Sequence, residues 1–241
     1  MNMRRFISCL VSVVLATSGT LRSQVSPSAA STSELRMHLA FSQRGKHRAV
    51  PAVIWLEPLA GTVTVPFVPH GPYTLTQKNR MFLPHLQVIP VGAVVKFPNA
   101  DPFFHNVFSL YDGKRFDLGL YEAGSSKSVT FSREGVSYIF CNIHPEMSAV
   151  VLALPTPLFA VADSEDSFVL RNIPPGEYQL HLWIEGVPQS ILNGLNHLVH
   201  LPSNPVDLGT LRVPLLPGGT VTHTNKFGDT YDPHSKSPYD R

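Results

Sequence analysis

Four side chains in this sequence could together bind a soft metal ion. Cys141, His144 and Met147 lie on one short segment, and His105 precedes them on a separate one. A thiolate, two imidazoles and a thioether are the donors found around copper, with the two histidines and the cysteine in a trigonal plane and a weak axial methionine. The donor set therefore predicts one copper ion with four ligands: His105, Cys141, His144 and Met147.

Other chemistries use the same residue types. A lone buried cysteine is often an inert apolar side chain, and Met147 taken alone would also suit a packed core. A Cys–His nucleophilic pair needs a separate base, an orienting group and an oxyanion hole, and the short loop indicates none of these. Zinc would favour more cysteines or carboxylates and no methionine. The combined spacing favours copper in a protein that is not an enzyme.

The first 23 residues have the pattern of a secretory signal peptide. Arg4 and Arg5 precede an apolar run from Phe6 to Ala16, and small residues follow it. This run is too short to span a bilayer, and cleavage is expected between about residues 18 and 23. No later stretch is long and apolar enough to cross a membrane. We therefore expect a soluble mature protein with a periplasmic location.

Removal of the signal peptide changes the charge and the cysteine count. The chain has 19 basic and 17 acidic residues, and loss of Arg4, Arg5 and Arg22 leaves 16 against 17, a net charge of −1 in place of +2. This balance does not favour nucleic acid as a partner. Cys9 also leaves, so Cys141 remains unpaired in a compartment where cysteines normally form disulfides. Such a thiol needs a functional reason.

The rest of the chain predicts an all-β protein. Helical periodicity is nearly absent, and 22 prolines with 16 glycines favour short strands joined by turns. Residues 35–70 contain two strand patterns, residues 73–154 form one compact β pattern, and residues 155–217 form a second, smaller one. Residues 218–241 are polar, and we expect them to be a disordered tail.

Strand alternation places the donors at strand ends. In residues 136–141 the side chains alternate, so that Ile139 and Cys141 share one face. Cys141 then ends one strand and Met147 begins the next, while Pro145 stiffens the loop between them. A metal held between two strands in this way would rearrange little, which is the property that an electron carrier needs.

Residues 73–154 contain five segments that together form a family pattern: Phe82-x-Pro84, Val91-Gly92, Phe97-x-Asn99-x-Asp101, His105-Asn106-Val107 and Cys141-x-x-His144-x-x-Met147. With these segments, residues 73–154 resemble a plastocyanin-type cupredoxin, a Greek-key β-sandwich. The short ligand loop is most similar to that of amicyanin, and the whole resembles plastocyanin-like proteins linked to methylamine utilisation.

The resemblance implies a function and a ligand arrangement. It implies one mononuclear blue-copper ion held by His105, Cys141 and His144, with Met147 axial, and single electrons carried between redox proteins such as a dehydrogenase or a cytochrome. It also implies that Asn106 links the two ligand segments by a hydrogen bond near Cys141 and Asn142. Among the ligands, we expect His144 to lie nearest to the surface and to be the route for the electron.

Residues 155–217 resemble the transthyretin-like fold of carboxypeptidase regulatory domains. The family pattern Phe-x-x-x-Asn-x-Pro-Pro-Gly-x-Tyr matches Phe168 to Tyr178. This copy lacks the two strands with which such a domain begins, and residues 35–56 supply a suitable pair. We therefore expect the cupredoxin unit to be inserted into a transthyretin-like sandwich. The simpler alternative makes residues 52–56 an edge strand of the copper domain.

A second function remains open at this point. The chain could be a non-redox secreted protein that holds copper or binds a partner, with the transthyretin-like module as its docking platform. The other prominent histidines are expected to be ordinary surface or packing residues: His85, His181, His197 and His200.

Overall fold

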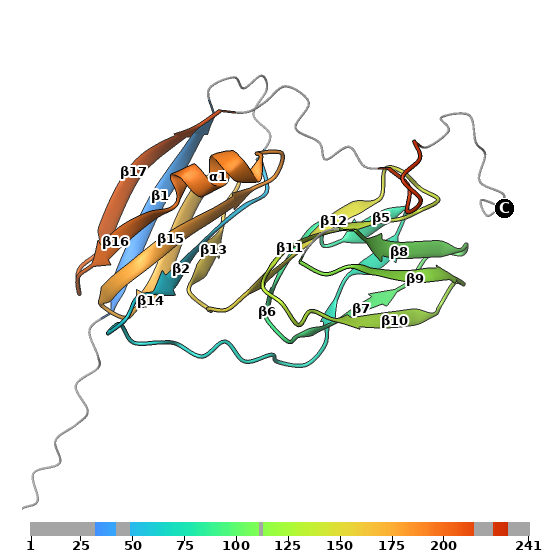
Figure 1. The fold of residues 1–241 in the computed structure, drawn as a ribbon, viewed down its shortest axis with the longest axis horizontal. Helices are drawn as coiled ribbons and strands as arrows, with labels where there is room; N and C mark the ends of the chain where they lie inside the picture. The colour runs from blue at the N-terminus through green and yellow to red at the C-terminus, as the bar shows by residue number, and fades with distance from the viewer. Residues whose placement is uncertain (1–31, 42–48, 111–112, 215–223, 231–241) are drawn as a thin grey trace, which may run out of the picture. The chain divides into compact units, whose positions relative to one another are not determined.

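The computed structural model describes residues 32–41, 49–110, 113–214 and 224–230. Regular structure in these ranges is almost entirely β-strand, so the prediction of an all-β protein is confirmed (Figure 1). The predicted signal peptide lies outside the described residues.

Ten of the described strands lie between residues 73 and 154. In chain order they are β3 (Tyr73–Thr74), β4 (Thr76–Lys78), β5 (Met81–Leu83), β6 (Leu86–Pro90), β7 (Val94–Pro98), β8 (His105–Ser109), β9 (Phe116–Tyr121), β10 (Ser126–Thr130), β11 (Gly135–Phe140) and β12 (Ser148–Leu154). They form a three-stranded sheet in the order β10-β7-β3, a five-stranded sheet in the order β6-β12-β11-β8-β9, and the hairpin β4-β5. We call this part the first sandwich.

The core of the first sandwich follows from alternation along its strands. Val95 and Phe97 of β7 are fully buried, and the residues between and before them are exposed. These two side chains share one apolar cluster with Ile139 of β11 and Val151 of β12. Because every second side chain of a strand points to the same face, the pattern brings the two sheets together around this core.

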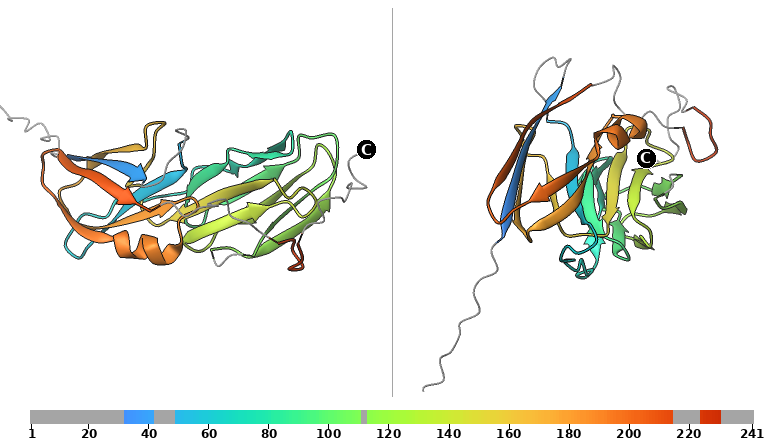
Figure 2. Two further views of the ribbon diagram at one scale, coloured as in Figure 1. Left: turned by 90° about the horizontal axis from the view of Figure 1, so that it is seen from above. Right: turned by 60° about the vertical axis from the view of Figure 1, so that its left-hand side comes forward.

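Strands from the two ends of the described chain build the second sandwich. They are β1 (Ser33–Phe41), β2 (Ala52–Pro58), β13 (Phe159–Val161), β14 (Ser167–Ile173), β15 (Gly176–Ile184), β16 (His197–Leu201) and β17 (Val206–Val213). Their sheets have the orders β14-β1-β17 and β13-β2-β15-β16. Figure 2 shows the blue β1 beside the orange-red β17, which it pairs in parallel.

The pairing of β2 bears on how the two sandwiches are connected along the chain. This strand lies between β13 and β15, and it is antiparallel to both. It is thus not an edge strand of the first sandwich. Strands before residue 59 and after residue 158 share sheets, as an insertion of residues 73–154 would require. The transthyretin-like identity of the second sandwich stays a prediction.

A short helix was not anticipated from the sequence. Helix α1 (Gln189–Leu195) follows Pro188, buries Leu192 and contacts β15. Pro188 is the N-cap residue, and its carbonyl accepts the N–H groups of Ile191 at 3.0 Å and Leu192 at 3.1 Å. Within the ranges that the structure describes, no helix has both the length and the apolar character to cross a membrane.

Strand β12 contributes to two apolar cores. Ala149, Val151 and Ala153 belong to the core of the first sandwich, together with Cys141 and Met147. Their neighbours Val150, Leu152 and Leu154 belong to a second core, which contains residues of β2 and β15. A strand buried on both faces has little freedom to shift, so it gives the segment before it a firm support.

Candidate metal centre

Three of the four predicted donors meet in one buried cluster. The Nδ1 atoms of His105 and His144 are 3.1 Å apart, and the Sγ atom of Cys141 lies 3.9 Å and 3.6 Å from them. The exposed fractions are 0% for His105, 0% for Cys141 and 3% for His144. Three donors of metal-binding type therefore face one another out of contact with solvent.

The three distances define a centre of suitable size for a metal ion. A triangle with these sides has a circumscribed radius of about 2.1 Å, and metal bonds to imidazole nitrogen and thiolate sulfur measure about 2.0–2.3 Å. One point in the plane of the donors thus lies at bonding distance from all three. The residues present fit an ion with two nitrogen ligands and one sulfur ligand.

The pairing of two strands brings the separate donor segments together. Phe108 of β8 pairs with Phe140 of the antiparallel β11. Continued for three residues, this register sets His105, the first residue of β8, opposite residue 143 in the ligand loop. Cys141 directly follows β11, one residue beyond the strand that we expected it to end.

Hydrogen bonds close the ligand loop on itself. The backbone N–H of Cys141 donates to the carbonyl of Met147 at 3.2 Å, and the N–H of Met147 donates to the carbonyl of His144 at 3.0 Å. Met147 directly precedes β12 and is fully buried in the same core as Cys141. Its backbone thus secures the loop, while the role of its sulfur as an axial ligand stays a prediction.

The surroundings of Cys141 include hydrogen-bond donors that suit a thiolate, but they do not by themselves ionise the thiol. Burial raises the pKa of the Cys141 thiol above its ordinary value, and hydrogen bonds from the backbone N–H groups of Asn106, Ile143 and His144 act in the opposite direction. Without a cation the thiol therefore keeps its proton at neutral pH. A bound metal ion would displace that proton, and the three N–H groups would then stabilise the thiolate.

A carboxylate lies behind the ring of His105. Oδ2 of Asp101 is 2.8 Å from Nε2 of His105, and both side chains are buried. Asp101 also accepts the backbone N–H groups of Asn79 at 2.6 Å and Arg80 at 3.0 Å. Burial raises the pKa of the Asp101 carboxyl, but these hydrogen bonds outweigh burial and hold the pKa below its ordinary value.

The same surroundings keep the imidazole of His105 neutral. Burial lowers the pKa of His105, and the opposing effect of Asp101 does not restore it to its ordinary value. The ring is therefore uncharged at neutral pH, with one nitrogen protonated and the other free to bind a metal. In the sequence, Asp101 is only the last residue of the matching segment Phe97-x-Asn99-x-Asp101, and nothing there indicates that it touches a donor.

An aromatic side chain covers both histidines. The ring of Phe103 lies 5.2 Å from that of His105 and 5.7 Å from that of His144, measured between centroids. The guanidinium carbon of Arg80 lies 5.3 Å from the Phe103 centroid. His144 is the most exposed of the four predicted donors but is only 3% exposed, so its role as the route for the electron stays a prediction. The adjacent Phe104 is 42% exposed.

A hydrogen-bonded chain connects the residues that follow two of the donors. Asn106 directs its backbone N–H to the sulfur of Cys141, while its side-chain amide donates to Oδ1 of Asp117 at 2.7 Å. Nζ of Lys226 lies 2.7 Å from Oδ2 of Asp117, and its backbone N–H donates to Oδ1 of Asn142 at 2.9 Å. The sequence predicted only the link from Asn106.

Lys226 lies in residues 224–230, a described part of the segment that we expected to be disordered. Its two hydrogen bonds join this segment to the ligand loop and to Asp117 of strand β9. Neither the polar composition of residues 218–241 nor any motif in them indicates this contact.

The remaining histidines have other surroundings. His85 lies 2.7 Å from a carboxylate oxygen of Glu185, and His200 lies 2.6 Å from one of Glu177. Among the described residues, none of the following belongs to the donor cluster: His85, His181, His197 and His200.

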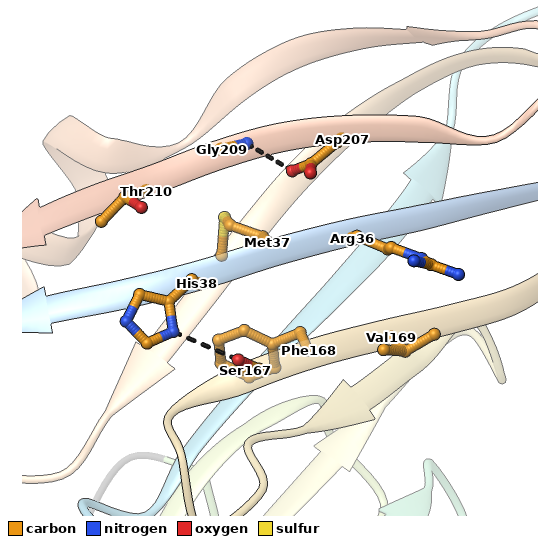
Figure 3. Close-up of a pocket in the computed structure, with 9 residues that line it drawn as sticks. All are labelled: Arg36, Met37, His38, Ser167, Phe168, Val169, Asp207, Gly209 and Thr210. Carbon is orange, nitrogen blue, oxygen red and sulfur yellow. Dashed lines mark hydrogen bonds between the residues drawn. The ribbon is translucent and has the colours of Figure 1, made fainter.

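A shallow groove on the outer face of the sheet β14-β1-β17 has a different character (Figure 3). In it, Nδ1 of His38 lies 3.1 Å from the hydroxyl of Ser167, and Asp207 accepts the N–H of Gly209 at 2.7 Å. These polar groups bond to one another, and the groove contains none of the three clustered donors.

Comparisons with known proteins give matches of structure but not of sequence. No family model matches the chain, and no curated protein matches it. Among solved structures, a purple cupredoxin from Nitrosopumilus maritimus is similar, with 24% identity and a TM-score of 0.31, over 34% of this chain and 99% of its own.

Two further solved structures share this partial similarity. Amicyanin from Paracoccus versutus has 23% identity and a TM-score of 0.32, over 36% of this chain and 85% of its own. The copper-containing nitrite reductase from Thermus scotoductus has 22% identity and a TM-score of 0.34, over 48% of this chain and 28% of its own. This chain thus spans less than a third of that enzyme.

Proposed function

We propose that this chain is a copper-binding electron carrier and that residues 73–154 form a cupredoxin domain. The observation that supports the proposal is the triangle of His105, Cys141 and His144, whose shape leaves one point at bonding distance from three donors. Met147, buried at the end of the same loop, is the proposed axial ligand.

Copper suits this donor set better than the metals that compete with it. A thiolate and a thioether are soft ligands, and imidazole binds copper well in both of its common oxidation states. Zinc sites prefer a tetrahedron of cysteine, histidine or carboxylate and seldom use methionine. The carboxylate of Asp101 contacts Nε2 of His105, the ring nitrogen that points away from the other donors, and so does not face the centre.

The residues of this chain hold the centre in one arrangement. When bound, copper supplies the exchange of a single electron between two oxidation states. The loop hydrogen bonds at Cys141 and Met147, the strand pairing next to His105 and the ring of Pro145 all oppose movement of the donors. Donors that move little when the charge changes allow fast electron exchange, which favours a carrier over a catalyst with an open ligand position.

The proposed cellular location and partners of the carrier are based on the sequence. Residues 1–23 are proposed to direct the chain to the periplasm as a signal peptide. Its partners are then secreted or membrane-attached redox proteins, such as a dehydrogenase or a cytochrome. The second sandwich is proposed to be transthyretin-like and to serve as a spacer or as a docking platform for such a partner.

Titration of the purified mature protein with Cu(II) tests the proposal. We expect an intense blue charge-transfer absorption that saturates at one equivalent and bleaches reversibly with ascorbate. Cys141→Ser should fold but stay colourless, while the control His200→Gln should behave as the wild type because His200 lies outside the donor cluster. Blue colour in Cys141→Ser would refute the ligand assignment.

A non-redox copper-holding protein is the second candidate. The burial of His144 under Phe103 favours this candidate, because an electron carrier needs the ring of one metal ligand to lie close to its redox partner. Stopped-flow mixing of the copper-loaded protein with small redox mediators separates the two candidates. Rapid, reversible exchange supports the carrier, and copper that is bound tightly but exchanges electrons slowly supports the holding protein.

A further inference from the structure

We propose that Asp101 is a positioning residue for the metal centre. Its carboxylate holds the proton on Nε2 of His105 and thereby turns the lone pair of Nδ1 towards the other donors. This inference rests on the proposed metal site, but it concerns the ring orientation of one histidine, which exists with or without the metal.

The hydrogen bond between the two residues fixes which nitrogen carries the proton. An ionised carboxylate only accepts hydrogen bonds, so at 2.8 Å from Oδ2 of Asp101 the Nε2 atom of His105 must donate. A neutral imidazole has one N–H, and Nδ1 therefore keeps its lone pair. That atom is the one that lies 3.1 Å from Nδ1 of His144 and 3.9 Å from Sγ of Cys141.

The carboxylate is itself held by a second segment of the chain. Oδ1 accepts the N–H of Asn79 at 2.6 Å, and Oδ2 accepts the N–H of Arg80 at 3.0 Å. Asn79 and Arg80 have φ values of 54° and 55° and form the tight turn between β4 and β5. Their left-handed backbone directs two successive N–H groups to one carboxylate, so Asp101 cannot rotate without losing both.

This arrangement has two consequences for a bound metal. A histidine that donates to a fixed carboxylate is a more basic and better oriented ligand, and loss of such a partner weakens metal binding by about 10–100-fold. The negative charge on Asp101 also favours the more positive oxidation state of the metal. Asp101→Asn should therefore weaken Cu(II) binding and raise the reduction potential.

The first test uses the metal-free protein with ¹⁵N-labelled histidine. Nuclear magnetic resonance at neutral pH should show His105 protonated on Nε2 in the wild type and a mixture of both tautomers in Asp101→Asn. This measurement on the wild type needs no variant to fold. Protonation of wild-type His105 on Nδ1 would overturn the proposal.

The second test compares Cu(II) affinity and reduction potential in matched variants. Asp163→Asn is the control, because Asp163 also accepts two backbone N–H groups, from Glu165 and Ser167, but lies in the second sandwich. We expect Asp101→Asn to bind Cu(II) about 10–100-fold more weakly and at a higher potential, and Asp163→Asn to match the wild type. A folded Asp101→Asn with wild-type affinity and potential would overturn the proposal.

The two tests also separate this inference from the proposed function. A colourless wild type in which His105 still carries its proton on Nε2 would remove the electron-carrier proposal and leave the orienting role of Asp101 in place. If the wild type is blue and Asp101→Asn changes neither the tautomer of His105 nor the Cu(II) affinity, the electron-carrier proposal stands and the orienting role of Asp101 is removed.

Discussion

The ring of Phe103 lies 5.7 Å from the ring of His144, and the imidazole beneath it is 3% exposed. The same aromatic side chain meets His105 edge-on at 5.2 Å. One residue outside the donor set therefore covers both imidazoles, and access to them from this side requires its ring to move.

Removal of this cover should open the centre. We expect Phe103→Ala to release copper to a soluble chelator several times faster than the wild type. Truncation of a fully buried phenylalanine to alanine typically costs about 3–5 kcal/mol of unfolding free energy. We expect a smaller cost here, because Phe103 is only half-buried. Phe104→Ala, which changes the exposed neighbour, is the control. Equal release rates in both variants would show that Phe103 does not gate access.

The axial position can be tested by a substitution that conserves volume. Met147→Leu should retain copper and cost less than about 1.5 kcal/mol of unfolding free energy, but it should shift the reduction potential because the axial donor tunes it. Met37→Leu changes another buried methionine, in the second sandwich, and should leave the potential unchanged. Voltammetry of both proteins distinguishes a ligand from a packing residue, and an unshifted Met147→Leu would point to packing.

Much of the donor arrangement could be predicted from the sequence because it is local. The spacing of Cys141, His144 and Met147 places three donor types on one loop, and strand alternation places Cys141 on the face of Ile139. His105 is the first residue of β8, so this donor also lies at a strand end. These predictions needed the periodicity of a strand and the chemistry of the side chains.

The surroundings of the donors depend on contacts that no local pattern contains. Asp101 meets a turn 22 residues earlier in the chain, and Lys226 meets a loop 84 residues before it. His144 beside Pro145 has the appearance of an exposed loop residue, yet Phe103 from another segment covers it. Such contacts form when distant segments pack together, so the donors were easier to predict than what holds and hides them.

The ion pair of Asp117 and Lys226 should contribute to stability in a pH-dependent way. Burial raises the pKa of Asp117, but hydrogen bonds from Lys226, Asn106 and Gly119 outweigh it and hold the pKa below its ordinary value in the folded protein. A depressed folded pKa means that the stabilisation is present above the unfolded pKa of about 3.9 and is lost as the pH falls through the folded value.

The expected size of this effect is small, because the two side chains are 40% and 25% exposed. The free energy of unfolding of the wild type should exceed that of Asp117→Asn by about 1 kcal/mol or less at neutral pH. Denaturant titrations should show this difference shrinking as the pH falls below the unfolded pKa of about 3.9 and vanishing once the folded carboxyl is also protonated. A difference that grows towards acid pH would contradict the assigned sign.

The two faces of β12 should respond differently to truncation. Leu152→Ala should cost about 2–5 kcal/mol of unfolding free energy and leave the blue absorption of the copper-loaded protein unchanged, because Leu152 faces the core of the second sandwich. Val151→Ala removes volume from the core that contains Cys141 and should shift that absorption. Visible spectra in which Leu152→Ala shifts more than Val151→Ala would refute this division.

X-ray absorption at the copper edge of the Cu(II)-loaded wild type tests the central claim most directly. The donors His105, Cys141 and His144 predict one short copper–sulfur bond and two copper–nitrogen bonds of about 2.0 Å at a single copper ion. Copper bound through nitrogen and oxygen alone, with no sulfur in its first coordination sphere, would contradict the account.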